Sequence, residues 1–147
     1  PVRERFYLAV AGQGAFTGDR GSRRLAAMEP LRTRPGSGVC LGYQAPDLLA
    51  RLRPGVTAFD IVADYDPARG YDNLNDLFTG RLDGFLARQA DLLDWGAMAF
   101  ITVQAGGVAT TPDGSPLDIF DDFRLRHADL LVGASPEVHA RMRAAMG

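Results

Sequence analysis

The chain has 147 residues, of which 46% are hydrophobic and 23% charged, and its formal net charge is −2. This composition is typical of a globular domain, and the length is enough to bury a core without disulfides or metal. The small negative charge gives no drive toward nucleic acid or an anionic membrane, so we expect neither as a partner. No run approaches the roughly eighteen apolar residues of a membrane span. We therefore predict a single domain over residues 1–147.

All sixteen basic residues are arginine. The absence of lysine excludes a Schiff-base lysine and a P-loop lysine from the chemistry. The single cysteine, Cys40, lies between Val39 and Leu41, which favours a buried core thiol over a nucleophile. One cysteine permits no internal disulfide, so a reducing compartment and a cytoplasmic location are expected.

The first third of the chain predicts one β-α-β unit over residues 5–43. Residues 5–11 read as a strand, residues 20–33 as a short helix that Pro30 kinks or ends, and residues 39–43 as a second strand. A glycine-rich turn with Gly12, Gly14 and Gly18 separates the first strand from the helix. Such a turn can hold a phosphate with its backbone N–H groups. It misses the dinucleotide fingerprint because the third glycine is displaced by one residue, and an ordinary flexible turn is the alternative.

The middle of the chain predicts a second β-α-β unit over residues 57–104. A helix over residues 45–52 precedes it. Apolar and polar residues alternate over residues 57–65, which indicates a strand with one solvent-exposed face. Residues 73–94 carry leucines and phenylalanines at three- and four-residue steps, which indicates one long helix with a buried Leu86. Residues 98–103 then read as a buried strand.

The last third predicts a hairpin around residues 106–114, followed by a strand over residues 128–132 and a terminal helix. Ser135 is the expected N-cap of that helix and Pro136 its first residue. The fold class that follows is α+β: two successive β-α-β units form a two-layer sheet with helices on one face, and the hairpin and strand-helix pair extend it. The alternative is a three-layer α/β sheet.

No residue pattern predicts a metal site or a cofactor. His127 and His139 lie twelve residues apart, which is not a metal-binding spacing. The aspartates between Asp64 and Asp76 lack the glycine and the closing glutamate of a calcium loop. We therefore expect neither a metal nor a cofactor.

Pro1 is the candidate catalytic residue. Its secondary amine is a base, and burial or nearby cations can lower its pKa toward neutrality, where it suits proton transfer. Pro1, a strand close behind it and two β-α-β units together resemble the tautomerase superfamily. The resemblance implies that Pro1 is the general base on a small enol or unsaturated acid, that arginines hold the substrate carboxylate, and that the chain forms a homo-oligomer.

A second resemblance gives a different class of protein. The segment with Trp95, Gly107-Val108, Asp113-Gly114-Ser115 and residues 119–123 is similar to the helix-then-hairpin segment of some tailed-phage major capsid proteins. It implies a non-enzymatic structural or assembly role. An anion-binding domain that uses Gly12, Gly14 and Gly18 is the third alternative.

Overall fold

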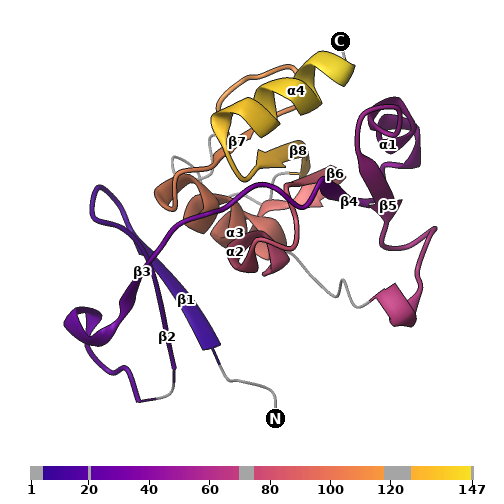
Figure 1. Cartoon of the computed structure of the whole chain (residues 1–147). Coiled ribbons are helices and arrows are strands. Elements are labelled where there is room, and N and C mark those ends of the chain that lie inside the picture. The colour runs from indigo at the N-terminus through magenta and orange to yellow at the C-terminus, as the bar shows by residue number, and fades with distance from the viewer. Residues whose placement is uncertain (1–4, 20, 70–74, 118–126, 147) are drawn as a thin grey trace.

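The computed structural model describes residues 5–19, 21–69, 75–117 and 127–146. The described residues form two sheets, four α-helices and two 3₁₀ turns (Figure 1). In chain order the elements are β1 (Arg5–Val10), β2 (Gly14–Asp19), η1 (Leu25–Ala27), β3 (Glu29–Leu31), β4 (Val39–Tyr43), α1 (Pro46–Leu52), β5 (Thr57–Asp60), η2 (Pro67–Arg69), α2 (Asp76–Thr79), β6 (Gly84–Asp91), α3 (Leu92–Gln104), β7 (Val108–Thr110), β8 (His127–Gly133) and α4 (Pro136–Met146).

The two sheets differ in the direction of their strands. The first has the order β1-β2-β3 and is antiparallel throughout. The second has the order β5-β4-β6-β8-β7, with β4 parallel to both β5 and β6, and β8 antiparallel to β6 and β7. Three parallel strands therefore carry their carboxyl ends to one edge of the five-stranded sheet.

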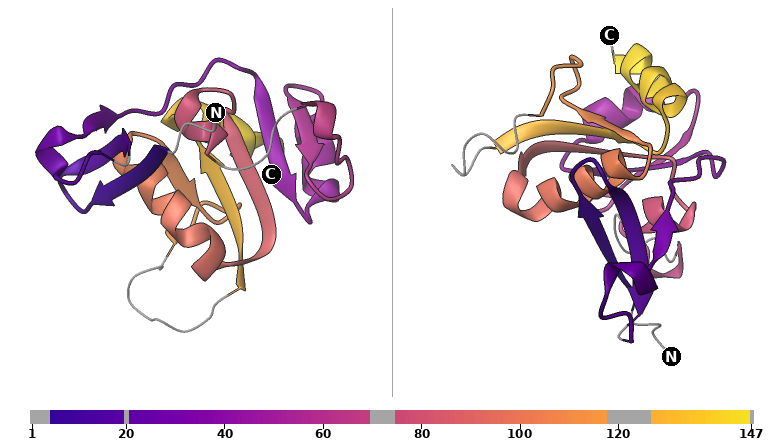
Figure 2. Two further views of the ribbon diagram at one scale, coloured as in Figure 1. Left: turned by 90° about the horizontal axis from the view of Figure 1, so that it is seen from below. Right: turned by 90° about the vertical axis from the view of Figure 1, so that its left-hand side faces the viewer.

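The elements stack in layers around two cores. Helices α1 and α4 cover one face of the five-stranded sheet, while α3 and α2 lie between its other face and the three-stranded sheet (Figures 1 and 2). Alternate residues of β6 reach opposite layers, with Phe85 and Ala87 facing α3 and Leu86 facing α1 and α4. The core beneath α1 and α4 consists of Cys40, Ala45, Leu48, Leu49, Leu52, Ala58, Leu86, Leu131, Val138, Met142 and Met146. None of the helices in the described part of the chain is both long and apolar enough to span a membrane.

The predicted α+β class is confirmed, and so are several of its elements. The strands over residues 5–11 and 39–43, the helix over residues 45–52 and the terminal strand-helix pair are all present. Ser135 caps α4 as expected, because its hydroxyl accepts a hydrogen bond of 3.2 Å from the N–H of Val138. Leu86 is fully buried, as predicted.

The long helix predicted over residues 73–94 is wrong, and so is the strand predicted over residues 98–103. Of the leucines and phenylalanines that suggested one helix, those described lie in α2, in the loop after it (Leu82), in β6 and at the start of α3, while Leu74 lies outside the described residues. Residues 98–103 continue α3. Gly80 ends α2 in the left-handed conformation, with φ at +76°. Gly84 is the first residue of β6, and a Cβ there would stand only 2.3 Å from Met142 Sδ, so the packing of α4 on this strand requires glycine. Short apolar runs do not distinguish a buried strand from a buried helix by their period alone.

Two further segments differ from their predicted form. Residues 20–33 contain no α-helix among the residues described; η1 leads into β3, where Pro30 pairs with Phe16 on an edge strand that tolerates proline. The strand predicted over residues 57–65 stops at Asp60. The Asp60 carboxylate accepts hydrogen bonds from the N–H groups of Val62 and Ala63, and these bonds turn the chain after β5.

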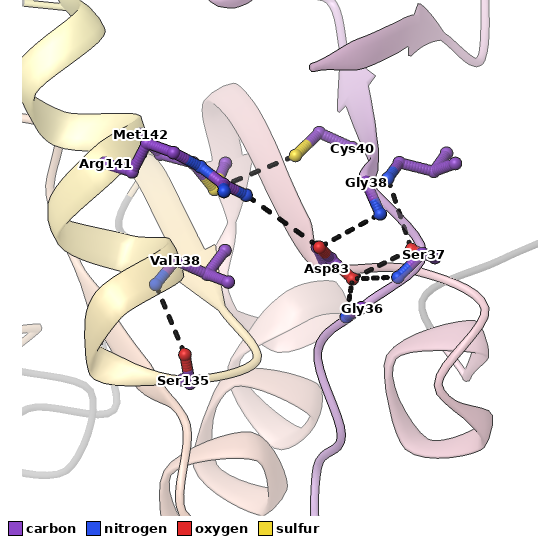
Figure 3. A network of polar contacts seen from close by, with 10 residues as sticks. Gly36, Ser37, Gly38, Cys40, Asp83, Ser135, Val138, Arg141 and Met142 are labelled. Carbon is purple, nitrogen blue, oxygen red and sulfur yellow. Dashed lines mark hydrogen bonds and ion pairs between the residues drawn. The ribbon is translucent and has the colours of Figure 1, made fainter. Parts of the chain in front are cut away.

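Asp83, just before β6, holds the two sheets together (Figure 3). The loop that leaves the three-stranded sheet wraps its carboxylate, which accepts hydrogen bonds of 2.8, 2.9 and 3.1 Å from the N–H groups of Gly36, Ser37 and Gly38. The Ser37 hydroxyl donates a further bond of 2.8 Å, and Arg141 of α4 lies 3.9 Å away. The Asp83 side chain is almost fully buried. Burial alone raises the pKa of this carboxyl, but the hydrogen bonds outweigh it and hold the pKa below its usual value.

We predict that Gly42→Ala destabilises the protein by about 1–3 kcal/mol, because overpacking forces side chains off their rotamers. The added Cβ would stand 2.2 Å from Leu49 Cδ1 in the core beneath α1. Gly55→Ala is the matched control, since the nearest atom to its Cβ position is 3.9 Å away. Urea denaturation of both variants measures the difference. Equal midpoints for the two variants would contradict the packing of α1 on β4.

We predict that acid unfolds the protein partly through Asp83. The unfolded carboxyl binds its proton near pH 3.9, whereas the folded carboxyl does so only at lower pH. The stability that Asp83 contributes is therefore complete above about pH 5 and is lost as the pH falls through the folded pKa. Asp83→Asn should lower stability at pH 7 by about 1–3 kcal/mol and flatten its dependence on acid pH. Glu29→Gln, at an exposed site, should keep the wild-type slope in thermal melts between about pH 5 and 2.

Candidate functional site

The candidate site is the edge of the five-stranded sheet where β4, β5 and β6 end. In open sheets with parallel strands, ligands bind outside the carboxyl ends of those strands. Chain segments that leave β4 and β6 lead directly into the N-termini of α1 and α3 at this edge. The antiparallel strand β8 begins at the same place, because His127 pairs with Asp91 in the ladder.

Backbone strain gathers at this edge. Within the described residues, the two non-glycine residues with positive φ are Gln44, at +53°, and Gln89, at +45°. Gln44 follows the last residue of β4, and Gln89 lies near the end of β6, the neighbouring parallel strand. A left-handed backbone costs of order 1–3 kcal/mol in a residue other than glycine, and such residues cluster at functional sites.

The strain at Gln89 belongs to a bulge in β6. The register between β6 and β8 shifts between Ala87 and Ala90, so the ladder is broken there. The Gln89 N–H lies where the ladder is broken, and it donates a hydrogen bond of 3.0 Å to the carboxylate of Asp129 on β8. Asp129 thereby holds the bulge, and the bulge sets the direction in which the chain enters α3.

Two carboxylates follow this bulge. Asp91 is the last residue of β6, and Asp94 lies in the first turn of α3. The positive end of a helix dipole favours an acidic side chain in the first turn. Asp94 is exposed, and among the described residues no side chain or N–H group donates a hydrogen bond to it. Its oxygens are therefore open to a cation, a water molecule or a ligand hydroxyl.

The sides of the site are formed by an ion pair and an aromatic cluster. Arg88 reaches from β6 to α1, where its Nη2 lies 2.5 Å from Asp47 Oδ2. Trp95 follows Asp94 in the sequence, and its ring lies on the opposite face of the sheet. The centroid of this ring is 5.5 Å from that of Tyr43 and 5.0 Å from that of Phe85. The indole fixes the first turn of α3 against β4 and β6.

The residues predicted from the sequence lie elsewhere. Pro1 is outside the described residues. Gly12 lies in the tight turn between β1 and β2, and Gly14 and Gly18 lie in β2, so the strand-turn-helix arrangement assumed for an anion-binding turn is wrong. A strand, β2, follows this turn in place of the helix that was expected.

The remaining reactive side chains have structural surroundings. Burial, reinforced by the charge of Asp83, raises the pKa of Cys40 to about 12, which keeps the thiol protonated. His139 of α4 makes a bond of 2.8 Å from Nε2 to the Thr110 hydroxyl, and burial with the nearby Arg143 lowers its pKa. Within the described part of the chain, no three His, Cys, Asp or Glu side chains stand close enough together to hold a metal ion.

The sequence does carry a signal for the site that our prediction missed. Gly80 and Gly84 interrupt the supposed helix, and each costs a helix about 1 kcal/mol relative to alanine. A break at these glycines leaves residues 84–91 as a strand and places Asp91 and Asp94 at a strand-to-helix junction. The bulge at Gln89 has no comparable signal, because Asp129, which accepts its N–H, lies 40 residues away in the sequence.

Comparison with known proteins gives a fold and no sequence family. No family model matches the sequence, and no curated protein sequence matches it significantly. Solved structures of the inositol monophosphatase type are similar. One is the inositol monophosphatase of Anabaena (Nostoc), with a TM-score of 0.65 and 19% identity over 96% of this chain and 53% of that one. A Pyrococcus horikoshii protein described as similar to inositol-1 monophosphatase has a TM-score of 0.70 and 17% identity, over 100% and 54%. Mycobacterium tuberculosis SuhB has a TM-score of 0.61 and 21% identity, over 96% and 53%.

These comparisons correct the family suggested by the sequence. The chain has the fold found in inositol monophosphatase structures and spans about half of their length. The resemblance to the tautomerase superfamily, with Pro1 as the base of an isomerase, is therefore wrong. The capsid resemblance and the anion-binding alternative are not supported either. A catalytic proline and an element order are shared by unrelated folds, because they say little about how strands are paired.

We predict that Asp129→Ala releases the bulge. The Gln89 N–H then loses its acceptor, which should cost about 1–2 kcal/mol of stability and speed hydrogen exchange at this amide. Asp129→Asn keeps a side-chain oxygen at the same place and should retain most of the protection. Denaturant melts and amide exchange by NMR measure both effects. If the alanine variant exchanges Gln89 at the wild-type rate, Asp129 does not hold the bulge.

Proposed function

We propose that this chain belongs to a phosphatase that hydrolyses the phosphate monoester of a small polyol, and that it contributes the edge containing Asp91 and Asp94 to the active site. The observation that supports the proposal most is the fold: nearly the whole chain superposes on the structure of an inositol monophosphatase and on that of a protein described as similar to one. The identity is low, so the activity is inferred from the fold together with the site and not from shared residues.

The position of the candidate site agrees with this activity. The exposed Asp94 lies at the carboxyl edge of the parallel strands, the same edge that carries the two strained residues Gln44 and Gln89. A small hydrophilic substrate needs such an open, polar edge and not a closed apolar pocket. Around it, the aromatic cluster of Trp95 and Tyr43 supplies a rigid wall.

The reaction places definite demands on the residues. A water molecule attacks phosphorus, the ester P–O bond breaks, and the leaving polyol oxygen takes up a proton, so that inorganic phosphate and the alcohol are formed. The phosphoryl oxygens carry negative charge throughout, and a carboxylate alone would repel them. Asp94 therefore acts through a cation or by orienting water, and does not contact the phosphate directly.

The carboxylates fit a magnesium ion. Mg²⁺ is bound in phosphate-processing sites by one or two protein carboxylates together with substrate phosphate and water, so a cluster of three acidic residues is not required. Asp91 and Asp94, three residues apart across the junction of β6 and α3, are the side chains that would hold it. When bound, the ion neutralises phosphoryl charge and polarises the attacking water. The protein's part is to fix both carboxylates through the bulge that Asp129 anchors.

Other expectations from the sequence stay predictions. A small-molecule substrate agrees with the similar structures. A homo-oligomer and a cytoplasmic location are proposals that sedimentation and cell fractionation test.

We predict that Asp94→Asn lowers Mg²⁺-dependent release of phosphate from inositol monophosphate by about 10²-fold or more in kcat/KM, since it removes a charged ligand of the ion. Glu29→Gln, on the three-stranded sheet, is the matched control and should leave the rate unchanged. Colorimetric phosphate measurement gives the rates, and calorimetry with inorganic phosphate gives Mg²⁺-dependent binding. A wild-type chain that neither releases nor binds phosphate contradicts the proposal, as does an unimpaired Asp94→Asn variant.

A further inference from the structure

A chain of hydrogen bonds joins α4 to the segment that follows β7. Figure 1 shows the helix beside this strand. Nε2 of His139, in α4, lies 2.8 Å from the hydroxyl oxygen of Thr110, the last residue of β7. The same hydroxyl oxygen lies 2.6 Å from the carbonyl oxygen of Thr111. His139 is buried, and its helix lies on the opposite side of the five-stranded sheet from α3 and Asp94.

These two distances assign the position of the proton on His139. A carbonyl has no hydrogen to donate, so the contact of 2.6 Å between two oxygens requires the Thr110 hydroxyl to donate to Thr111. The hydroxyl has only one hydrogen and therefore accepts the bond from His139, whose Nε2 carries the proton. Burial, together with the charge of Arg143, lowers the pKa of His139. The ring is therefore mainly neutral at neutral pH, and its Nδ1 holds an unshared electron pair.

The Nδ1 atom of His139 is open to the surface. Among the described residues no group donates a hydrogen bond to it, and the one buried side-chain nitrogen or oxygen there without a partner is Arg88 Nε. Nδ1 is therefore not sealed inside the protein. It borders a groove of about 380 Å³ whose described walls are His139, Ala140, Arg143 and Ala144. The two alanines are small and leave space in front of the ring.

Arg143 adds a cation to the same groove. It follows His139 by four residues, so both side chains project from one face of α4. Its guanidinium lies over Gly114, where a Cβ would stand 2.5 Å from Nη1. No carboxylate in the described part of the chain forms an ion pair with Arg143. The carboxylate of Asp113, next to Gly114, is hydrogen-bonded within its own turn.

The groove therefore presents several donors and one acceptor to the same ligand. A ligand must offer anionic oxygens to the guanidinium and an O–H group to Nδ1. Inorganic phosphate has both, because it keeps at least one P–OH group throughout the neutral pH range. Sulfate has the same shape but no O–H group. A phosphate monoester loses its last P–OH group at its second pKa of about 6. An oxygen of either of these anions would face the lone pair of Nδ1.

We infer that His139 Nδ1 and Arg143 form a binding site for inorganic phosphate, in the groove between α4 and the turn after β7. Arg143 binds the charged oxygens, and Nδ1 accepts the hydrogen of the P–OH group. The site selects free phosphate over phosphate esters and over sulfate. This inference rests on the hydrogen-bond chain through Thr110, and it depends neither on the phosphatase activity nor on Mg²⁺.

The test titrates the 147-residue chain with phosphate, sulfate and methyl phosphate at about pH 7.5, above the ordinary pKa of histidine. EDTA is present, so that no Mg²⁺-dependent site takes part. NMR of the imidazole signals reports binding, and His139→Gln identifies which signals belong to His139. We expect phosphate to shift these signals saturably and to bind at least about tenfold more tightly than the other two anions, because a site built around a hydrogen bond rejects analogues without the hydroxyl. The ¹⁵N shifts should show a protonated Nε2 and an unprotonated Nδ1.

Arg143→Gln should weaken phosphate binding by at least about tenfold, since it removes a charge-assisted hydrogen bond. Arg143 is exposed, so the variant should keep the wild-type melting temperature. Arg24→Gln is the matched control, because Arg24 is also exposed and has no ion pair among the described residues. It should bind phosphate as the wild type does.

Three results would overturn the inference. Sulfate or methyl phosphate that binds as tightly as phosphate would mean that the groove attracts any anion by charge alone. A proton on Nδ1, or His139 signals that phosphate does not shift, would exclude this nitrogen as the acceptor. Unimpaired binding by Arg143→Gln would exclude the guanidinium. The comparison of the three anions uses the wild-type chain and decides the question even if a variant misfolds.

Discussion

One buried carboxylate fixes how the sheets of this protein are joined. Asp83 accepts three N–H groups from the loop that leaves the three-stranded sheet, and its side chain lies beside Arg141 of α4. The backbone of Asp83 also joins these elements. Its N–H donates a hydrogen bond to the carbonyl of Val39 at the start of β4, and its C=O accepts one from the N–H of Ala134 after β8. The loop, two strands and one helix thus meet at a single residue. A buried charge is tolerated here because every oxygen is hydrogen-bonded.

That junction also positions the candidate site, although it lies at the opposite end of β6. Once the starts of β4, β6 and β8 are fixed relative to one another, the ladder determines where each strand ends or begins. The bulge at Gln89 then offsets the last residues of β6, and α3 starts with Asp94 facing outward. Rigid elements at one end and a strained junction at the other are what a site for precise positioning requires.

The sequence predicts the class of the fold and the elements whose signals are local. Ser135 and Pro136 mark the start of α4, and the run around Cys40 marks β4, because caps and apolar runs depend on neighbouring residues. The end of β6 depends instead on Asp129, and its start at Gly84 depends on the close approach of Met142; both residues are distant in sequence, and a helical spacing of leucines concealed the strand between them. Asp91 and Asp94 are visible in the sequence as acidic residues, but only the strand pairing shows that they lie at the carboxyl edge of the parallel strands. The family could not be predicted, because the resemblance to tautomerases rested on the N-terminal proline and on the order of the elements. Neither of these determines which strands pair with one another.

The place of β8 in the sheet has a consequence for how the chain acquires its structure during synthesis. β6 is the central strand, and its second neighbour is β8, which the ribosome produces after β6, α3 and β7. At about 5–20 residues per second, β6 waits for several seconds with one side unpaired and with Leu86 lacking the cover of α4. The nascent chain is therefore exposed to wrong strand pairing at β6 for that interval.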